Sequence, residues 1–329
     1  MTSFDQPHAP ARDDVPRETS SELLPADRRY ERFARLGGSS VLLILCGIGL
    51  FLVIRSGDAL STAGLRFLVE TTWSPNSIPP VFGVASLMFG TVLVAGIALL
   101  FAVPLAIGCA LFLTEVCPIR FRKPFVTLVD LLAAIPSLIF GLWGLFFMAP
   151  RVIGFSQFLT EHFSWIPFFE TTDENFKSSI FMASLIVAVM TIPICTSVMR
   201  EVFAQTPPME KEAALALGGT RWGMIRTVVL PFGKGGIIGG AMLGLGRALG
   251  ETIAVAILFG SVSPTTIRVL GGGGSTIASM IALTFGEASE FGISALMAAG
   301  LALFVLTLVV NLIASSIVSR SRSGAGVEI

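Results

Sequence analysis

An arginine and a glutamate, Arg247 and Glu251, lie four residues apart in the otherwise apolar stretch GLGRALGETIA. The guanidinium group of arginine donates hydrogen bonds in a planar fork that suits an oxyanion, and a nearby carboxylate can act as its counter-charge. A charge at the centre of a bilayer costs about 2.5 to 3.5 kcal/mol on insertion scales, so two charges in an apolar segment need a reason. The chemistry that suits this pair is the binding of an anion.

A helical projection places both charges on one face. At roughly 100° per residue, Arg247 and Glu251 fall on the same side as three glycines, and large apolar side chains fall on the other. Small residues at this spacing let a second helix approach closely, so we expect the charged face to look toward another span or a second subunit. The three glycines are Gly236, Gly240 and Gly244.

An internal salt bridge that only stabilises the helix is the alternative for this pair. An arginine four residues before a glutamate is the less favourable order, and desolvation offsets most of the attraction in a buried pair. We therefore favour a transport role, in which Arg247 contacts the anion and Glu251 holds Arg247 when the path is empty.

The elements that carry these residues are predicted to be membrane-spanning helices. Of the 329 residues, 53% are hydrophobic and 13% are charged, against about a quarter charged in soluble domains. A helix needs about 20 apolar residues to cross the hydrocarbon, and six segments approach that length. The sequence thus predicts an all-α, polytopic membrane protein with six transmembrane helices, over about 36–56, 84–113, 125–149, 178–200, 235–260 and 294–318. Three prolines inside these segments are predicted kinks or hinges: Pro104, Pro136 and Pro193.

The distribution of Lys and Arg predicts the orientation. With the N-terminus inside, sixteen of these residues lie on the inner side and five on the outer side. Positive segments tend to stay in the cytoplasm, so both termini are expected there. Residues 1–35 are rich in proline and charge and are expected to form a disordered cytoplasmic tail, and 321–329 a short cytoplasmic C-terminal tail. The glycine-rich GGGGS at 271–275 is expected to be a flexible loop.

Metal, redox and nucleic-acid chemistry find little support in the sequence. The four cysteines lack CxxC spacing and are expected to be buried free thiols, and two isolated histidines suggest no metal site. The net charge is zero, which gives no argument for nucleic acid. Because no catalytic constellation is evident, we expect no enzymatic activity and no cofactor.

The segment at about 201–234, between the fourth and fifth predicted spans, is predicted to form a short helix-turn-helix on the cytoplasmic side. Good helix formers run from Met209 to Leu217, and Gly218 with Gly219 can cap that helix in a left-handed conformation. Thr220 can cap the next helix, which Pro231 is expected to interrupt. A solvated hairpin without a partner is the alternative.

Two motifs carry a resemblance to a known family. KEAALALGGTRWGMIRTVVLP resembles the EAA loop of ABC-importer permeases, and LAAIPSLIFGLWGLF with GGAMLGLGRALGETIAVA is similar to signature segments of PstC-type subunits of phosphate-specific ABC transporters. The resemblance implies a MetI-like permease fold: 36–83 holds the first span and an outer loop, and 84–320 is the permease core. It also implies that this loop couples to an ATPase through Glu212, Ala213, Ala214, Gly218 and Pro231. Trp222, in the same loop, is a further candidate contact to that ATPase.

The same resemblance implies partners and a location. The partners would be a second, homologous permease subunit, a pair of ATP-binding subunits and an extracytoplasmic phosphate-binding protein, in lipid of the bacterial inner membrane. This chain has no GxxxxGK[ST] loop, so ATP would be hydrolysed by the partner. Two alternatives stay open: an ABC permease for another anion, such as sulfate or molybdate, and an ion-driven secondary carrier.

Overall fold

The computed structural model describes residues 25–171, 175–263 and 268–322. The chain divides into two units, Met1–Ile48 and Gly49–Ile329. Helix α1 (Pro25–Arg55) begins inside the segment predicted to be a disordered tail. The rest of that tail, residues 1–24, lies outside the described residues, as do most of the residues in the predicted end at 321–329.

Apolar helices of membrane-spanning length dominate the described chain. Five are long and apolar enough to cross a membrane: 29–55, Ala85–Val116, Ser137–Phe163, Ile180–Ala204 and Glu290–Ser316. A sixth span results if the helices at Arg221–Phe232 and Lys234–Leu249, bent by 66° at Gly233, are taken together. The predicted all-helical, multi-pass architecture is therefore confirmed.

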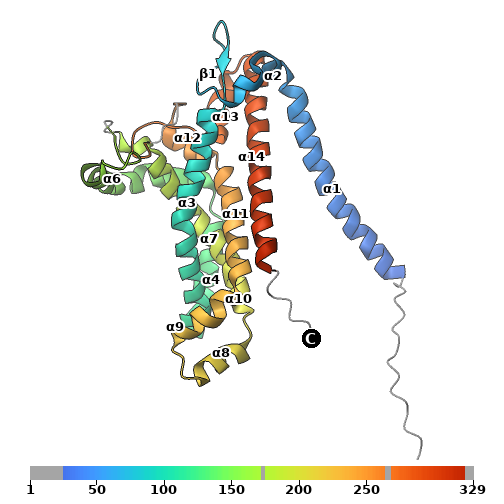
Figure 1. The fold of residues 1–329 in the computed structure, drawn as a ribbon, viewed down its shortest axis with the longest axis vertical. Coiled ribbons are helices and arrows are strands. Elements are labelled where there is room, and N and C mark those ends of the chain that lie inside the picture. The colour runs from blue at the N-terminus through green and yellow to red at the C-terminus, as the bar shows by residue number, and fades with distance from the viewer. Residues whose placement is uncertain (1–24, 172–174, 264–267, 323–329) are drawn as a thin grey trace, which may run out of the picture. The chain divides into compact units, whose positions relative to one another are not determined.

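Helices α3 (Ala85–Leu111), α7 (Ile180–Ala204) and α11 (Lys234–Leu249) form the centre of the second unit (Figure 1). Helix α14 (Glu290–Arg322) runs beside α11. Alanines at three- and four-residue spacing form the buried face of α3, which lets α7 pack closely against it. Pro104 lies inside α3 and Pro193 inside α7, and both helices continue through their proline.

The third predicted span, 125–149, was wrong in its limits. Helix α4 (Ile119–Ala133) ends before Pro136, and a new run begins with α5 (Ser137–Trp143) and continues through η3 (Gly144–Met148) and α6 (Ala149–Phe163). Proline disfavours helical geometry in the residue before it, and Pro136 itself is extended, with ψ at 140°. Residues 150–163, expected in a loop, are helical as part of α6.

Short elements close the end of the second unit opposite the segment at 201–234 (Figure 1). They are α2 (Gly57–Ala63), η1 (Gly64–Leu68), α13 (Ile277–Thr284), η6 (Phe285–Glu287) and a hairpin of β1 (Trp73–Ser74) with β2 (Val81–Phe82). The hairpin is antiparallel, with Trp73 opposite Phe82. At its base, hydrogen bonds from the backbone and side chain of Thr72, and from the backbone of Thr71, lower the pKa of Glu70.

The glycine-rich loop at 271–275 is packed, which corrects the expectation of a flexible loop. Gly273 donates its backbone N–H to the Ser178 carbonyl oxygen at 3.0 Å, and Gly272 forms a bridge with Ser179. The loop thereby joins η4 (Phe176–Ser178) and the start of α7, and Gly274 is buried with a φ of 135° that suits glycine.

The cysteines are all free, but the expectation that they are buried holds only for Cys117 and Cys195. Cys46 and Cys109 are exposed, on helix faces that no other part of the described chain covers. Apolar residues on such faces suit contact with lipid.

Candidate functional site

The glycine face of α11 packs against α7 of the same chain. Gly236, Gly240 and Gly244 are buried, and a Cβ on Gly244 would lie 2.6 Å from the Sγ of Cys195. The Cys195 thiol donates to the Gly240 carbonyl oxygen at 3.2 Å. The predicted close approach of a second helix is confirmed, and the neighbour is a span of this chain.

Helix α11 stops at Leu249, so the fifth predicted span, 235–260, was wrong as a single helix. Three residues, Gly250 to Thr252, separate it from α12 (Ile253–Phe259). Glycine disfavours helix by about 1 kcal/mol, and the Thr252 hydroxyl donates to the Gly250 carbonyl oxygen at 3.0 Å in competition with the helical backbone. The helical projection therefore holds for Arg247 but not for Glu251.

Glu251 lies inside this break and is buried, with 7% of its surface exposed. Its Oε1 accepts a hydrogen bond from the backbone N–H of Ala254 at 3.3 Å, in the first turn of α12. A Cβ on Gly141 of α5 would lie 2.8 Å from the Cα of Ala254, so this turn packs closely on α5. A carboxylate here satisfies a free N–H at a helix start, where negative charge is favoured.

Arg247 lies in the last turn of α11 and is half-buried. Its Nε is buried and has no hydrogen-bond partner. Four ion pairs occur among the described residues, and neither Arg247 nor Glu251 belongs to one: Arg35–Glu31, Arg200–Asp130, Lys211–Glu115 and Arg268–Glu170. The structure thus brings the two charges to the same helix break without pairing them, and leaves a buried donor that an anion could use.

The segment at 201–234 folds as the predicted helix-turn-helix. Helix α8 (Pro208–Ala216) ends at a turn in which Gly218 has a φ of 85°, a conformation that favours glycine. Thr220 caps α9 (Arg221–Met224) by accepting the N–H of Gly223 at 3.1 Å. The chain continues through η5 (Ile225–Val229) and α10 (Leu230–Phe232), and it bends at Gly233 and not at Pro231 as expected.

The surface of this segment is open. Glu212, Ala213, Gly218 and Pro231 are exposed, Ala214 is half-buried, and Trp222 is 62% exposed. Two further apolar side chains, Met209 and Leu217, are exposed at the two ends of α8 and were not singled out from the sequence. The sequence signal that could have identified them was their position at the ends of an alanine-rich helix. Exposed apolar side chains that lie together indicate a contact surface.

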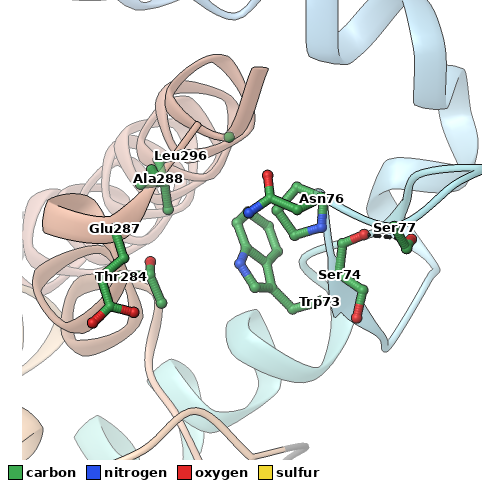
Figure 2. A pocket seen from close by; sticks show the side chains of 10 residues that line it. Trp73, Ser74, Asn76, Ser77, Thr284, Glu287, Ala288 and Leu296 are labelled. Carbon is green, nitrogen blue, oxygen red and sulfur yellow. Dashed lines mark hydrogen bonds between the residues drawn. The ribbon is translucent and has the colours of Figure 1, made fainter. Parts of the chain in front are cut away.

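A separate cavity of about 450 Å³ lies at the hairpin end. Figure 2 shows Trp73 and Asn76 on one side of it and Thr284 and Glu287 on the other. Ser289 donates to the Asn76 side-chain oxygen at 2.6 Å and so joins the two sides. The lining holds a carboxylate and no cation, so it does not suit an anion.

Comparisons with known proteins give a consistent result. Residues 102–323 match the model of a family described as binding-protein-dependent transport system inner membrane component. The chain is 41% identical to the phosphate transport system permease protein PstC 2 of Mycobacterium tuberculosis, over 92% of this chain and 96% of that protein. It is 43% identical to the phosphate transport system permease protein PstC of Mycobacterium leprae, over 88% and 92%.

A solved structure shows the same fold. It is a bacterial ABC transporter involved in the import of the acidic polysaccharide alginate, 23% identical to this chain, with a TM-score of 0.54. The match covers 89% of this chain and 99% of that one.

Proposed function

We propose, since this chain belongs to the family of binding-protein-dependent transport system inner membrane components, that it is the PstC-type permease subunit of an ATP-driven importer of inorganic phosphate. The names of its relatives support the substrate. The observation that carries the mechanism is the buried Nε of Arg247, which has no partner at a helix break in an apolar segment. A buried cationic donor without a partner is costly, so its presence here supports a transient anionic partner.

In this mechanism Arg247 is the anion contact of the path. Its planar donors suit the oxygens of phosphate, and it lies where α11 gives way to irregular backbone, the type of backbone that lines cavities in transporters. Glu251, inside the break, is the counter-charge. When α11 and α12 move relative to each other, Glu251 can exchange its bond with Ala254 for one with Arg247, which returns the anion to the aqueous path.

The segment around α8 is the coupling surface for the ATP-binding subunits. Ala213 and the half-buried Ala214 have small side chains that allow close contact, and Glu212 adds an exposed carboxylate. Gly218 fixes the turn, and Trp222 and Pro231 flank it. ATP is hydrolysed by a PstB-like pair of subunits, and a homologous PstA-like permease completes the path. A PstS-like binding protein delivers phosphate to the extracytoplasmic face of the transporter. Helix α8 and both termini lie on the cytoplasmic side.

Movement between the two faces needs places where the helices flex. Pro136, at the break between α4 and α5, is the strongest candidate hinge, because the chain there is already non-helical. Pro104 and Pro193 each remove one hydrogen bond inside α3 and α7 and permit smaller bends.

Reconstitution of the whole transporter tests this function. The complex, purified with its binding protein, is placed in vesicles with ATP, and uptake of phosphate, sulfate and molybdate is compared. We expect phosphate alone to stimulate ATP hydrolysis and to accumulate. Stimulation by sulfate or molybdate instead would reassign the substrate, and uptake driven by an ion gradient after ATP depletion would reassign the class.

A further inference from the structure

An ion pair joins the coupling segment to the end of α3. The Nζ of Lys211, in α8, lies 2.7 Å from the Oε1 of Glu115. The two residues are 96 positions apart in the sequence, and the side chain of Glu115 is 7% exposed and that of Lys211 is 20% exposed. This is the most buried of the ion pairs among the described residues.

Glu115 belongs to η2 (Phe112–Val116), a π-helical turn that continues α3. Such turns are rare and occur frequently at functional sites. A second polar contact holds the same turn, since Arg122 of α4 donates to the Thr114 carbonyl oxygen at 2.7 Å. The end of α3 is therefore tied to both α4 and α8.

These side chains surround a cavity of about 310 Å³. Its charged lining comes from four elements: Glu115, Arg122, Arg200, Glu201 and Lys211. Arg200, at the end of α7, also lies 3.9 Å from the Oδ1 of Asp130 on α4. The cavity is thus the place where the ends of α3, α4 and α7 meet the first turn of α8.

Apart from this pair, helix α8 is held by the adjoining α9 and η5 and makes few contacts with the rest of the bundle. All of its residues are described and none is buried, and only Ala214 packs at the edge of an apolar cluster that includes Met199 and Phe203. A buried ion pair contributes little to stability compared with apolar packing, but removal of one partner leaves an uncompensated charge. The pair is better suited to fixing the position of α8 than to holding the fold together.

We propose that Glu115 and Lys211 are positioning residues that transmit the movement of α8 to α3. The inference rests on the proposed function, in which α8 contacts the ATP-binding subunits. Helix α3 packs along α7 and α11, and α11 carries Arg247, so a displacement of η2 reaches the helices beside the anion contact. Without the pair, α8 still meets the ATPase, but its movement no longer reaches α3 directly.

The test measures phosphate taken up per ATP hydrolysed by the reconstituted, complete transporter. We expect Glu115→Gln and Lys211→Met each to lower this ratio at least tenfold while ATP hydrolysis continues. The double variant Glu115→Lys with Lys211→Glu restores the pair in reverse and is expected to recover much of the ratio. Glu170→Gln is the matched control, because the Glu170–Arg268 pair is about half exposed and lies far from α8 in the sequence.

The possible outcomes distinguish a failure of this inference from a failure of the proposed function on which it rests. A wild-type ratio in both single variants would overturn the inference alone. Variants that lose assembly or thermal stability, but keep a wild-type ratio in the complexes that do form, would show that the pair is only an anchor and would also overturn it. A wild-type complex that takes up no phosphate would overturn the proposed function and the inference together.

Discussion

Gly244 of α11 lies directly against Cys195 of α7, so that a Cβ built on the glycine would fall 2.6 Å from the cysteine Sγ. The same Cβ would fall 2.7 Å from the Cγ2 of Thr191. Both neighbours are buried, so neither side chain can move into solvent. The contact holds the helix that carries Arg247 against the centre of the bundle.

Substitution of Gly244 by alanine is expected to destabilise the protein by about 1 to 3 kcal/mol, because the added methyl overpacks this contact. The control is Gly246→Ala on the same helix, where a Cβ meets nothing within 4 Å. Alanine favours helix over glycine by about 1 kcal/mol, so the control should be neutral or stabilising. Thermal unfolding of the detergent-purified complex measures both, and equal melting temperatures would contradict the packing argument.

Arg247→Ala is expected to lower phosphate transport about ten- to a hundredfold, the equivalent of about 1.5 to 3 kcal/mol for a hydrogen bond to a charged group. Arg247→Lys keeps the charge but loses the fork, so an intermediate rate is expected. ATP-driven uptake into vesicles is the measurement. Arg66→Ala, which removes an exposed cation at the hairpin end, is the control.

Co-purification with the partner subunits accompanies these rates. Normal uptake by Arg247→Ala would refute the anion contact. Loss of assembly alone, with normal uptake by the complexes that form, would favour a structural role for this residue.

Two variants separate the two roles of Glu251. Glu251→Gln keeps an oxygen that can accept the N–H of Ala254 but lacks the negative charge, whereas Glu251→Ala lacks both. We expect Glu251→Ala to lose about 1 kcal/mol of stability with the cap, and Glu251→Gln to lose little. Both should slow phosphate uptake, because the counter-charge is gone. Uptake at the wild-type rate in Glu251→Gln would show that Glu251 acts only as a helix cap.

Gly218→Val is expected to uncouple ATP hydrolysis from uptake. Position 218 has a φ of 85°, where a β-branched side chain is strained by about 1 to 2 kcal/mol, so the turn after α8 must distort. Gly218→Asn is the control, because asparagine tolerates the left-handed region. The measurement is phosphate uptake and ATPase activity of the same vesicles. Normal transport by the valine variant would count against this turn as part of the coupling surface.

The fold was predictable where one signal dominated. Long apolar runs predicted the positions of α3, α7 and α14, even though α3 and α7 each contain a proline. Gly218, Gly219 and Thr220 predicted the turn between α8 and α9. The prediction failed where local chemistry overrides hydropathy. Pro136 splits a run that is apolar on both sides, and the loop at 271–275 has the composition of a linker but is held by Ser178 and Ser179.

The candidate site was predictable in its residues but not in its geometry. Charge within an apolar stretch singled out Arg247 and Glu251, yet the projection assumed a helix that in fact stops at Leu249. Gly250 and Thr252 were the local sequence signals for the break, and their effect depends on how α12 packs against α5. The contact of Lys211 with Glu115 could not be predicted from the sequence, because nothing in either segment specifies a partner 96 residues away.

Gly250, in the break between α11 and α12, is exposed on the surface of this chain, and its neighbour Ile253 is 48% exposed. Hydrocarbon offers no hydrogen bonds, so irregular backbone at this depth has to be covered by protein or water. In the proposed transporter a companion permease would cover this break, so a copy synthesised without that companion would leave the break open to lipid. We therefore expect the cellular level of this chain to follow the level of that companion subunit.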